Sequence, residues 1–165
     1  MKGLITAQQR FLFPDTPLEE MPSSLRVVSA ENGKVGIQLM FECAQAAGGV
    51  RVCGEGFDAE IYRMIDIPVE YNTGDGVNQG GAMVVLCEEC PDYAVRKAPF
   101  RVYDCLEPVQ DGRIEAKNGR ACAYVCLSPM KDTPAGKHEI CLECSAGEEK
   151  HLCRIEYSIY PVSYD

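Results

Sequence analysis

Cysteine is the residue type with the greatest chemical potential in this chain, which has ten cysteines among its 165 residues. Four of them form two Cys-x-x-Cys pairs, Cys87 with Cys90 and Cys141 with Cys144, and four thiolates can hold a tetrahedral zinc ion. Within a strand, residues three apart point to opposite faces, so Cys141 and Cys144 could reach one metal only if the strand broke there. The sequence therefore favours reduced thiols that fill core space. A zinc-stabilised structural domain is the alternative.

Other patterns that could support catalysis or cofactor binding are incomplete. A nucleophilic cysteine needs a neighbouring base, and the two histidines, His138 and His151, stand where strands are expected to begin. The glycine-rich residues 74–81 lack the Gly-Lys-Ser/Thr of a phosphate-binding loop. Four acidic residues fit no calcium-binding loop: Asp104, Glu107, Asp111 and Glu115. We therefore expect no cofactor and no catalytic site in this chain.

Aromatic side chains in loops could form a platform for sugar rings. The chain has eight tyrosines, five phenylalanines and no tryptophan. Tyr71, Tyr93 and Tyr103 lie near expected loops and are, with Asp104, the candidates for sugar or interface contacts. Most of the aromatic residues are expected to pack in the core or between domains.

Charge and hydropathy limit the partners that this chain could bind. The formal net charge is −9, from 25 acidic and 16 basic residues. This balance disfavours nucleic acid, which requires a basic stripe, and anionic membrane surfaces. No stretch approaches the roughly 18 apolar residues of a membrane helix. The N-terminus has no continuous hydrophobic region before Gln8, unlike a secretory signal, so we expect a cytoplasmic protein with reduced cysteines.

The chain divides into a lead-in and one patterned domain. Residues 1–24 contain Pro14, Pro17 and Pro22 and are expected to be extended rather than helical. Residues 25–162 are long enough for a single domain with its own core. Within it, residues 25–30 and 35–43 are expected to pair as a hairpin around Asn32-Gly33.

Short strands are predicted along the rest of the domain. In residues 82–87 and 121–127 both the odd and the even positions are apolar, which predicts central strands that are buried on both sides. The glycine-rich, polar residues 72–81 predict a long loop. Further stretches with a period of two are residues 59–69, 138–144 and 153–159. About eight short strands separated by turns indicate an all-β fold, an antiparallel β-sandwich that is immunoglobulin-like or jelly-roll-like.

Three stretches of the sequence carry a resemblance to a known family. They are residues 30–39, the Asp-x-Leu-x-Pro segment within residues 103–108, and residues 124–140 with Pro134 and Gly136. In this order they resemble the N-terminal β-sandwich domain of the glycoside hydrolase family that includes β-N-acetylgalactosaminidases, and related uncharacterised bacterial proteins. Family members often have Trp where this chain has Tyr124. In the third stretch, the turn is expected to let the two flanking strands pair antiparallel.

The resemblance implies a non-catalytic accessory domain, because the catalytic carboxylates of that family lie in a downstream barrel. This chain would pack against such a barrel, and Asp104 would cap backbone amides of its loop. A stand-alone carbohydrate-binding module is an alternative, with a glycan as the partner and Tyr71, Tyr93, Tyr103 and Asp104 as its contacts.

Overall fold

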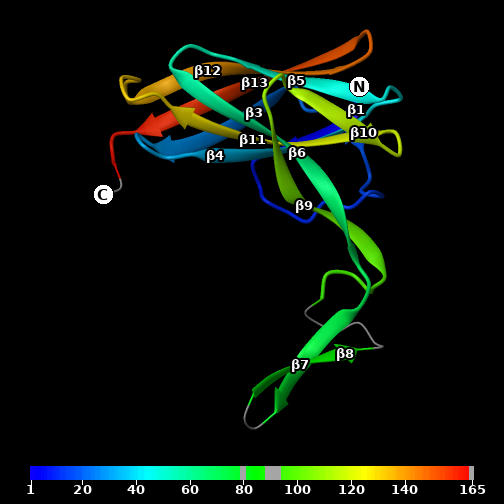
Figure 1. The fold of residues 1–165 in the computed structure, drawn as a ribbon. Coiled ribbons are helices and arrows are strands. Elements are labelled where there is room, and N and C mark those ends of the chain that lie inside the picture. Colours follow the sequence, from blue (N-terminus) through cyan, green and yellow to red (C-terminus); the bar gives the residue numbers. More distant parts are fainter. Residues whose placement is uncertain (79–80, 88–93, 164–165) are drawn as a thin grey trace.

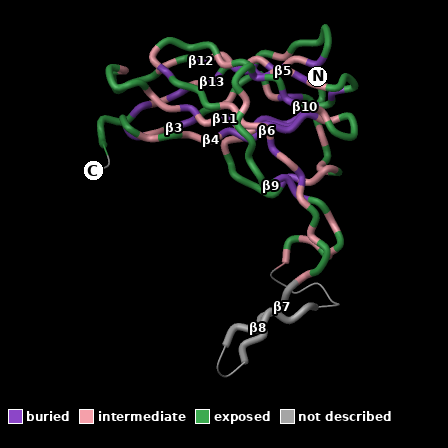
Figure 2. The backbone as a smooth tube through the Cα atoms, in the orientation of Figure 1, coloured by how far each residue is buried: buried purple, intermediate pink, exposed green. Residues whose placement is uncertain are grey.

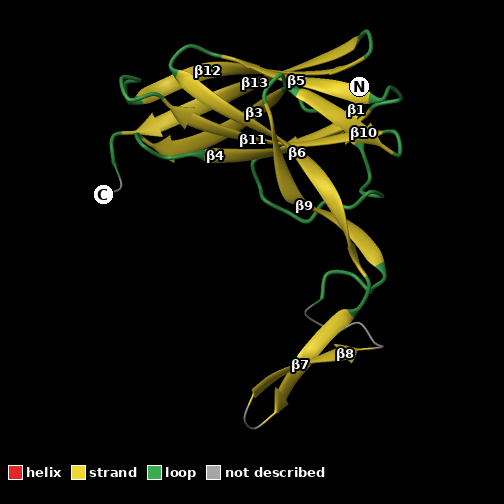
Figure 3. Ribbon diagram, viewed as in Figure 1, coloured by secondary structure: helices red, strands yellow, loops and turns green. Residues whose placement is uncertain are grey.

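The computed structural model describes residues 1–78, 81–87 and 94–163 of the chain. The strands in this part are β1 (Lys2–Thr6), β2 (Glu19–Glu20), β3 (Ser24–Ala30), β4 (Val35–Glu42), β5 (Ala47–Cys53), β6 (Phe57–Val69), β7 (Asn72–Asn78), β8 (Gly81–Cys87), β9 (Phe100–Val109), β10 (Arg113–Lys117), β11 (Arg120–Pro129), β12 (Gly136–Ala146) and β13 (Glu149–Tyr160). The described residues contain no helix that could span a membrane. Figure 3 shows that strands and loops make up this part of the chain.

Eleven of the described strands form one mixed sheet that is mostly antiparallel. Its main path runs β2-β1-β4-β11-β10-β5-β12-β13-β3, while β6 pairs with β11 and β9. Strand β10 pairs with β11 through Lys117 and with β5 through Arg113. The sheet therefore passes from one half to the other through β10 and curls into a half-barrel (Figure 1).

The predicted all-β, mostly antiparallel class is confirmed, but the arrangement differs from an eight-strand sandwich. A sandwich keeps two separate sheets, whereas β10 makes the two halves continuous here. The pairing of β3 with β13 is parallel, with Ser24 opposite Arg154. Period-two patterning indicates which residues form strands, but not where a sheet bends or which strand is its edge.

The predicted hairpin of residues 25–30 with 35–43 is wrong. Strand β3 pairs with β13, whereas β4 has β1 on one edge and β11 on the other. The turn itself is present, because the amide of Gly33 donates to the carbonyl of Ala30 at 3.1 Å. Since both edges of β4 are occupied, the turn carries the chain from one half of the sheet to the other.

The expected antiparallel pairing across residues 124–140 is also wrong, for the same reason. Strand β11 is bonded to β4 and β6 along residues 123–127, so neither edge is free for β12. Leu127 and Ile140 instead lie in one core cluster from the two halves of the sheet. Gly136 has a φ of 135°, which favours glycine at this crossing.

The predicted loop at residues 72–81 is largely strand. Residues Asn72–Asn78 form β7, which pairs with β8 in a separate two-stranded sheet, with Gly76 opposite Met83. This hairpin extends away from the body, beyond the ribbon of β6 and β9 (Figure 1). The strand predicted at residues 82–87 is present as β8, but its expected central position is wrong, because β8 belongs to a two-stranded sheet. The central strand predicted at residues 121–127 is confirmed, because β11 is paired on both edges.

The principal core lies between the two halves of the sheet. Leu39 and Val125 face it from one half, and Leu142 and Ile155 from the other; each is fully buried. The predicted inward faces of the last two strands are confirmed from Ile140 onward, because Ile140, Leu142, Cys144, Cys153, Ile155, Tyr157 and Ile159 are all buried. Figure 2 shows buried segments through the middle of the body.

A second core cluster covers the outer face of β4, β6 and β11. It contains Leu4, Leu12, Met40, Met64, Tyr103 and Cys122. Two of these residues come from the predicted lead-in, whose strand β1 pairs with β4. The first 24 residues therefore contribute a strand and buried side chains to the body of the protein.

Candidate functional site

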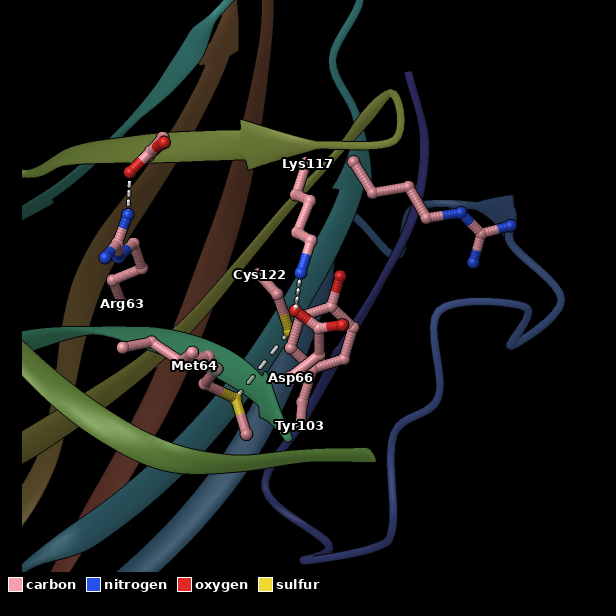
Figure 4. A pocket seen from close by; sticks show the side chains of 9 residues that line it. Arg63, Met64, Asp66, Tyr103, Lys117 and Cys122 are labelled. Carbon is pink, nitrogen blue, oxygen red and sulfur yellow. Dashed lines mark hydrogen bonds and ion pairs between the residues drawn. The ribbon is translucent and has the colours of Figure 1, made fainter. Parts of the chain in front are cut away.

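A polar depression, which we call the charged pocket, lies at the corner of β6, β9, β10 and β11. It encloses about 290 Å³ and is lined by Arg63, Met64, Ile65, Asp66, Tyr103, Glu115, Lys117, Arg120 and Cys122. Figure 4 shows Lys117 reaching toward Asp66, with the ring of Tyr103 beside that carboxylate and Cys122 directed toward Met64. The charged pocket brings cations and carboxylates together in a small volume.

Asp66 is the centre of this pocket, and only 3% of its side chain is exposed. Lys117 Nζ lies 2.7 Å from Oδ1, and Arg101 Nε donates to Oδ2. Burial by itself would raise the pKa of Asp66, but the hydrogen bonds from Lys117 and Arg101 outweigh it, so the pKa is lowered from 3.8. Asp66 is thus held as a carboxylate and is unsuited to donate a proton near neutral pH.

The other charged residues of the pocket are also paired. Arg63 forms ion pairs with Glu115 and with Glu107, the latter at 2.7 Å, and Arg120 donates to the carbonyl of Thr16 at 2.6 Å. These contacts join β6 to β9 and β10, and β11 to the N-terminal segment. The charged pocket therefore ties elements of the fold together.

A second depression, the aromatic hollow, adjoins the charged pocket and shares Met64 and Tyr103 with it. It encloses about 380 Å³ and is lined by Gln9, Arg10, Phe11, Gln38, Met64, Tyr103, Asp104, Leu106 and Tyr124. Gln38 holds one rim in place, because its side chain exchanges two hydrogen bonds of 3.0 Å with the backbone of Arg10. The hollow has a partly apolar floor and polar groups at its rim.

The four residues predicted to contact sugar or a partner are only partly brought together. Tyr103 and Asp104 both line the aromatic hollow, whereas Tyr71 is exposed and does not line it. Tyr93 lies outside the described residues. The sequence missed Phe11 and Tyr124 as members of this group. Because side chains alternate along a strand, the sequence could have placed Tyr124 on the same face of β11 as Cys122. No periodic signal marks Phe11 in its proline-rich segment.

The segment around Asp104 is a strand and not the expected loop. Tyr103 is opposite Asp66 and Cys105 is opposite Ile65, so Asp104 is an extra residue in β9, a β-bulge. Tyr103 is buried, and burial raises its pKa to about 12. The expected capping of loop amides by Asp104 has no counterpart among the hydrogen bonds of the described residues.

The described cysteines lie in varied environments. Cys144 is buried in the core. Cys141 lies on the other face of β12 and is paired in register with Cys53 of β5. The side chains of Cys87 and Cys90, the other pair of the zinc alternative, lie outside the described part of the chain. The described residues hold no group of three or more metal-ligating side chains.

The described strands place a cysteine opposite a histidine in one pair, but this pair does not support catalysis. Cys144 is opposite His151 in the ladder of β12 and β13. Burial raises the pKa of the Cys144 thiol to about 12, which disfavours the thiolate. His151 Nε2 lies 2.9 Å from the carbonyl oxygen of Pro22, and His138 Nε2 is engaged in the same way by Pro134.

Three of the four acidic residues considered as calcium ligands are engaged by neighbouring groups. Glu107 and Glu115 both pair with Arg63, and a side-chain oxygen of Asp111 accepts a hydrogen bond from the amide of Arg113. These carboxylates stabilise the outer surface of the sheet and its turn.

Comparisons with known proteins identify a solved structure with a similar fold. No protein-family model and no curated protein matches the sequence. The structure is similar to part of a family 123 glycoside hydrolase from Clostridium perfringens that was studied for glycolipid glycan hydrolysis, with a TM-score of 0.64 and 10% identity. Family 123 enzymes are β-N-acetylgalactosaminidases. A PapD-like domain of human CEP192 has a TM-score of only 0.35, with 15% identity over 87% of this chain and 84% of that one.

The match to the glycoside hydrolase covers 99% of this chain but 28% of the other chain. The resemblance inferred from residues 30–39, 103–108 and 124–140 is therefore confirmed at the level of the fold. This chain spans less than a third of the length of the enzyme that it resembles.

Proposed function

We propose that this chain is a non-catalytic accessory domain of a larger glycoside hydrolase-like protein, in which it packs against a downstream barrel. The single observation that carries the proposal is the asymmetry of the structural match, which includes almost all of this chain and 28% of the hydrolase. A region of that kind leaves most of the larger chain to hold other domains.

The chemistry of the charged pocket supports a structural role over catalysis. Glycoside hydrolysis ordinarily uses two carboxyl groups, one of which has a raised pKa so that it can protonate the leaving group. The pKa of Asp66 is lowered, and Glu115 is paired with Arg63. The central carboxylate of this pocket is thus stabilised in its charged form.

The proposal is tested by assaying this chain with an aryl N-acetyl-β-galactosaminide and by reading the gene beyond Asp165. We expect no hydrolysis above the uncatalysed rate and an encoded barrel that contains paired acidic residues. The proposal fails if the chain alone hydrolyses the substrate with saturation kinetics, or if a stop codon follows Asp165.

A further inference from the structure

The aromatic hollow is built on rows of side chains that cross four neighbouring strands. Gln38 of β4 is opposite Tyr124 of β11, Tyr124 is opposite Tyr62 of β6, and Tyr62 is opposite Pro108 of β9. In the adjacent row, Leu106 of β9 is opposite Met64 of β6. Because the register is set by backbone hydrogen bonds, this face presents rings and apolar groups side by side.

The apolar part of this surface is open to solvent. Phe11 is 64% exposed and Leu106 is 45% exposed, and both line the hollow. The rings of Tyr62 and Tyr124 lie 6.4 Å apart. Large apolar groups that are gathered and exposed in this way are typical of binding surfaces.

Gly36 determines how Tyr124 lies on the sheet. A Cβ at Gly36 would be 1.8 Å from the hydroxyl oxygen of Tyr124 and 2.4 Å from its Cζ. The end of the tyrosine ring therefore lies over the backbone of β4, where only glycine leaves room. The ring extends across the sheet and forms part of a platform.

The rim of the hollow offers one group of each charge. Among the described residues, neither the Asp104 carboxylate nor the Arg10 guanidinium has a hydrogen bond or ion pair. Tyr103, the other predicted contact, forms part of the floor beside Met64. A ligand that accepts and donates hydrogen bonds but carries no net charge would match this rim.

We propose that the aromatic hollow binds a neutral saccharide. A pyranose ring presents an apolar face of C–H groups and a rim of hydroxyls, which fit the platform of Phe11 and Tyr124 and the polar groups of Asp104 and Arg10. The volume of about 380 Å³ is within the range of small-molecule sites. The proposal does not depend on the accessory-domain function, because binding by this chain alone requires no barrel.

The proposal is tested by adding galactose, N-acetylgalactosamine and lactose separately to the ¹⁵N-labelled chain and recording amide chemical shifts. We expect saturable shifts for at least one sugar, centred on residues 9–11, 38, 103–106 and 124. Phe11→Ala and Asp104→Asn should each weaken that binding at least tenfold. Tyr160→Ala is the matched control, since Tyr160 is 59% exposed on β13 and does not line the hollow, and it should leave the dissociation constant unchanged.

Two results would overturn the saccharide site. One is the lack of saturable shifts with all three sugars. The other is unchanged binding in folded Phe11→Ala and Asp104→Asn proteins, whose melting temperatures report that they are folded. Neither result bears on the accessory-domain proposal, which is decided by the hydrolysis assay and by the sequence beyond Asp165.

Discussion

At the scale of single residues, Asp66 shows how one buried charge can organise a corner of the molecule. Its carboxylate is almost fully covered, and Lys117 of β10 and Arg101 of β9 both bind it. A buried carboxylate is costly unless its oxygens are paired. The two cations meet this requirement and connect three strands through one side chain.

Asp66→Asn is expected to lower the free energy of unfolding by about 1–3 kcal/mol at pH 7, because two charge-assisted hydrogen bonds are weakened. The pKa of Asp66 is lowered on folding, so its contribution is complete above about pH 4 and is lost as the pH falls through the folded-state pKa. Urea unfolding at pH 7 and pH 3 should therefore show a smaller difference from wild type in acid. Glu60→Gln, at an exposed pair with Lys34, should change stability by less than about 1 kcal/mol; equal effects of the two substitutions would contradict the argument.

At the scale of elements, the turn before β10 joins the two halves of the sheet. The carbonyl of Gly112 accepts a hydrogen bond of 2.8 Å from the amide of Val50, and β10 begins at the next residue. Gly112 has a φ of 68°, and a Cβ there would be 2.1 Å from the carbonyl oxygen of Val50. This close approach lets β10 pair with β5 and then with β11.

Comparing Gly112→Ala with Gly119→Ala separates two costs to stability, that of a steric overlap and that of a positive φ in a residue other than glycine. Gly119 also has a positive φ, 75°, but no atom lies within 4 Å of a Cβ placed there. Each substitution should cost about 1–2 kcal/mol for the positive φ, and Gly112→Ala about 1–3 kcal/mol more for the overlap with Val50. Chemical denaturation of both variants measures the difference, and equal losses would mean that the turn relaxes without cost.

At the scale of the whole molecule, the N-terminal segment closes the second core cluster. Leu12 is fully buried, and the carbonyl of Leu12 accepts a hydrogen bond of 2.8 Å from the amide of Tyr103 in β9. Arg96, near the base of the β7–β8 hairpin, makes two contacts with Asp15 at 2.7 and 2.5 Å. The segment thus binds both the sheet and the connection that leads to β9.

Leu12→Ala is expected to destabilise the protein by about 2–5 kcal/mol, because it would leave a cavity beneath the N-terminal segment. The neighbouring Phe11→Ala should have an effect of only about 0.5 kcal/mol, since Phe11 is 64% exposed. Thermal unfolding of the two variants provides the comparison. Similar melting temperatures would show that residues 1–24 contribute little to the stability of the body.

Local patterning predicted much of the secondary structure. The alternation in β12 and β13 identified their buried faces from Ile140 onward, and the apolar run of residues 121–127 identified a central strand. These predictions hold because side-chain direction alternates along any strand and burial on both faces requires an apolar run. The candidate site was predicted only in part, through Tyr103 and Asp104.

The partners of the strands were decided by the tertiary structure. Residues 25–30 and 35–43 carry a good turn signal, yet β4 is paired with β1 and β11, and β3 with β13. Pairing depends on which edges remain free once distant strands have met, and no local pattern contains that information. For the same reason the aromatic hollow, which joins Phe11, Tyr124 and Asp104 from distant segments, is visible only after folding. The sequence by itself determined many of the strands and the inward faces of β12 and β13, because side chains alternate along a strand. The three-dimensional arrangement decided the neighbours and hence the site.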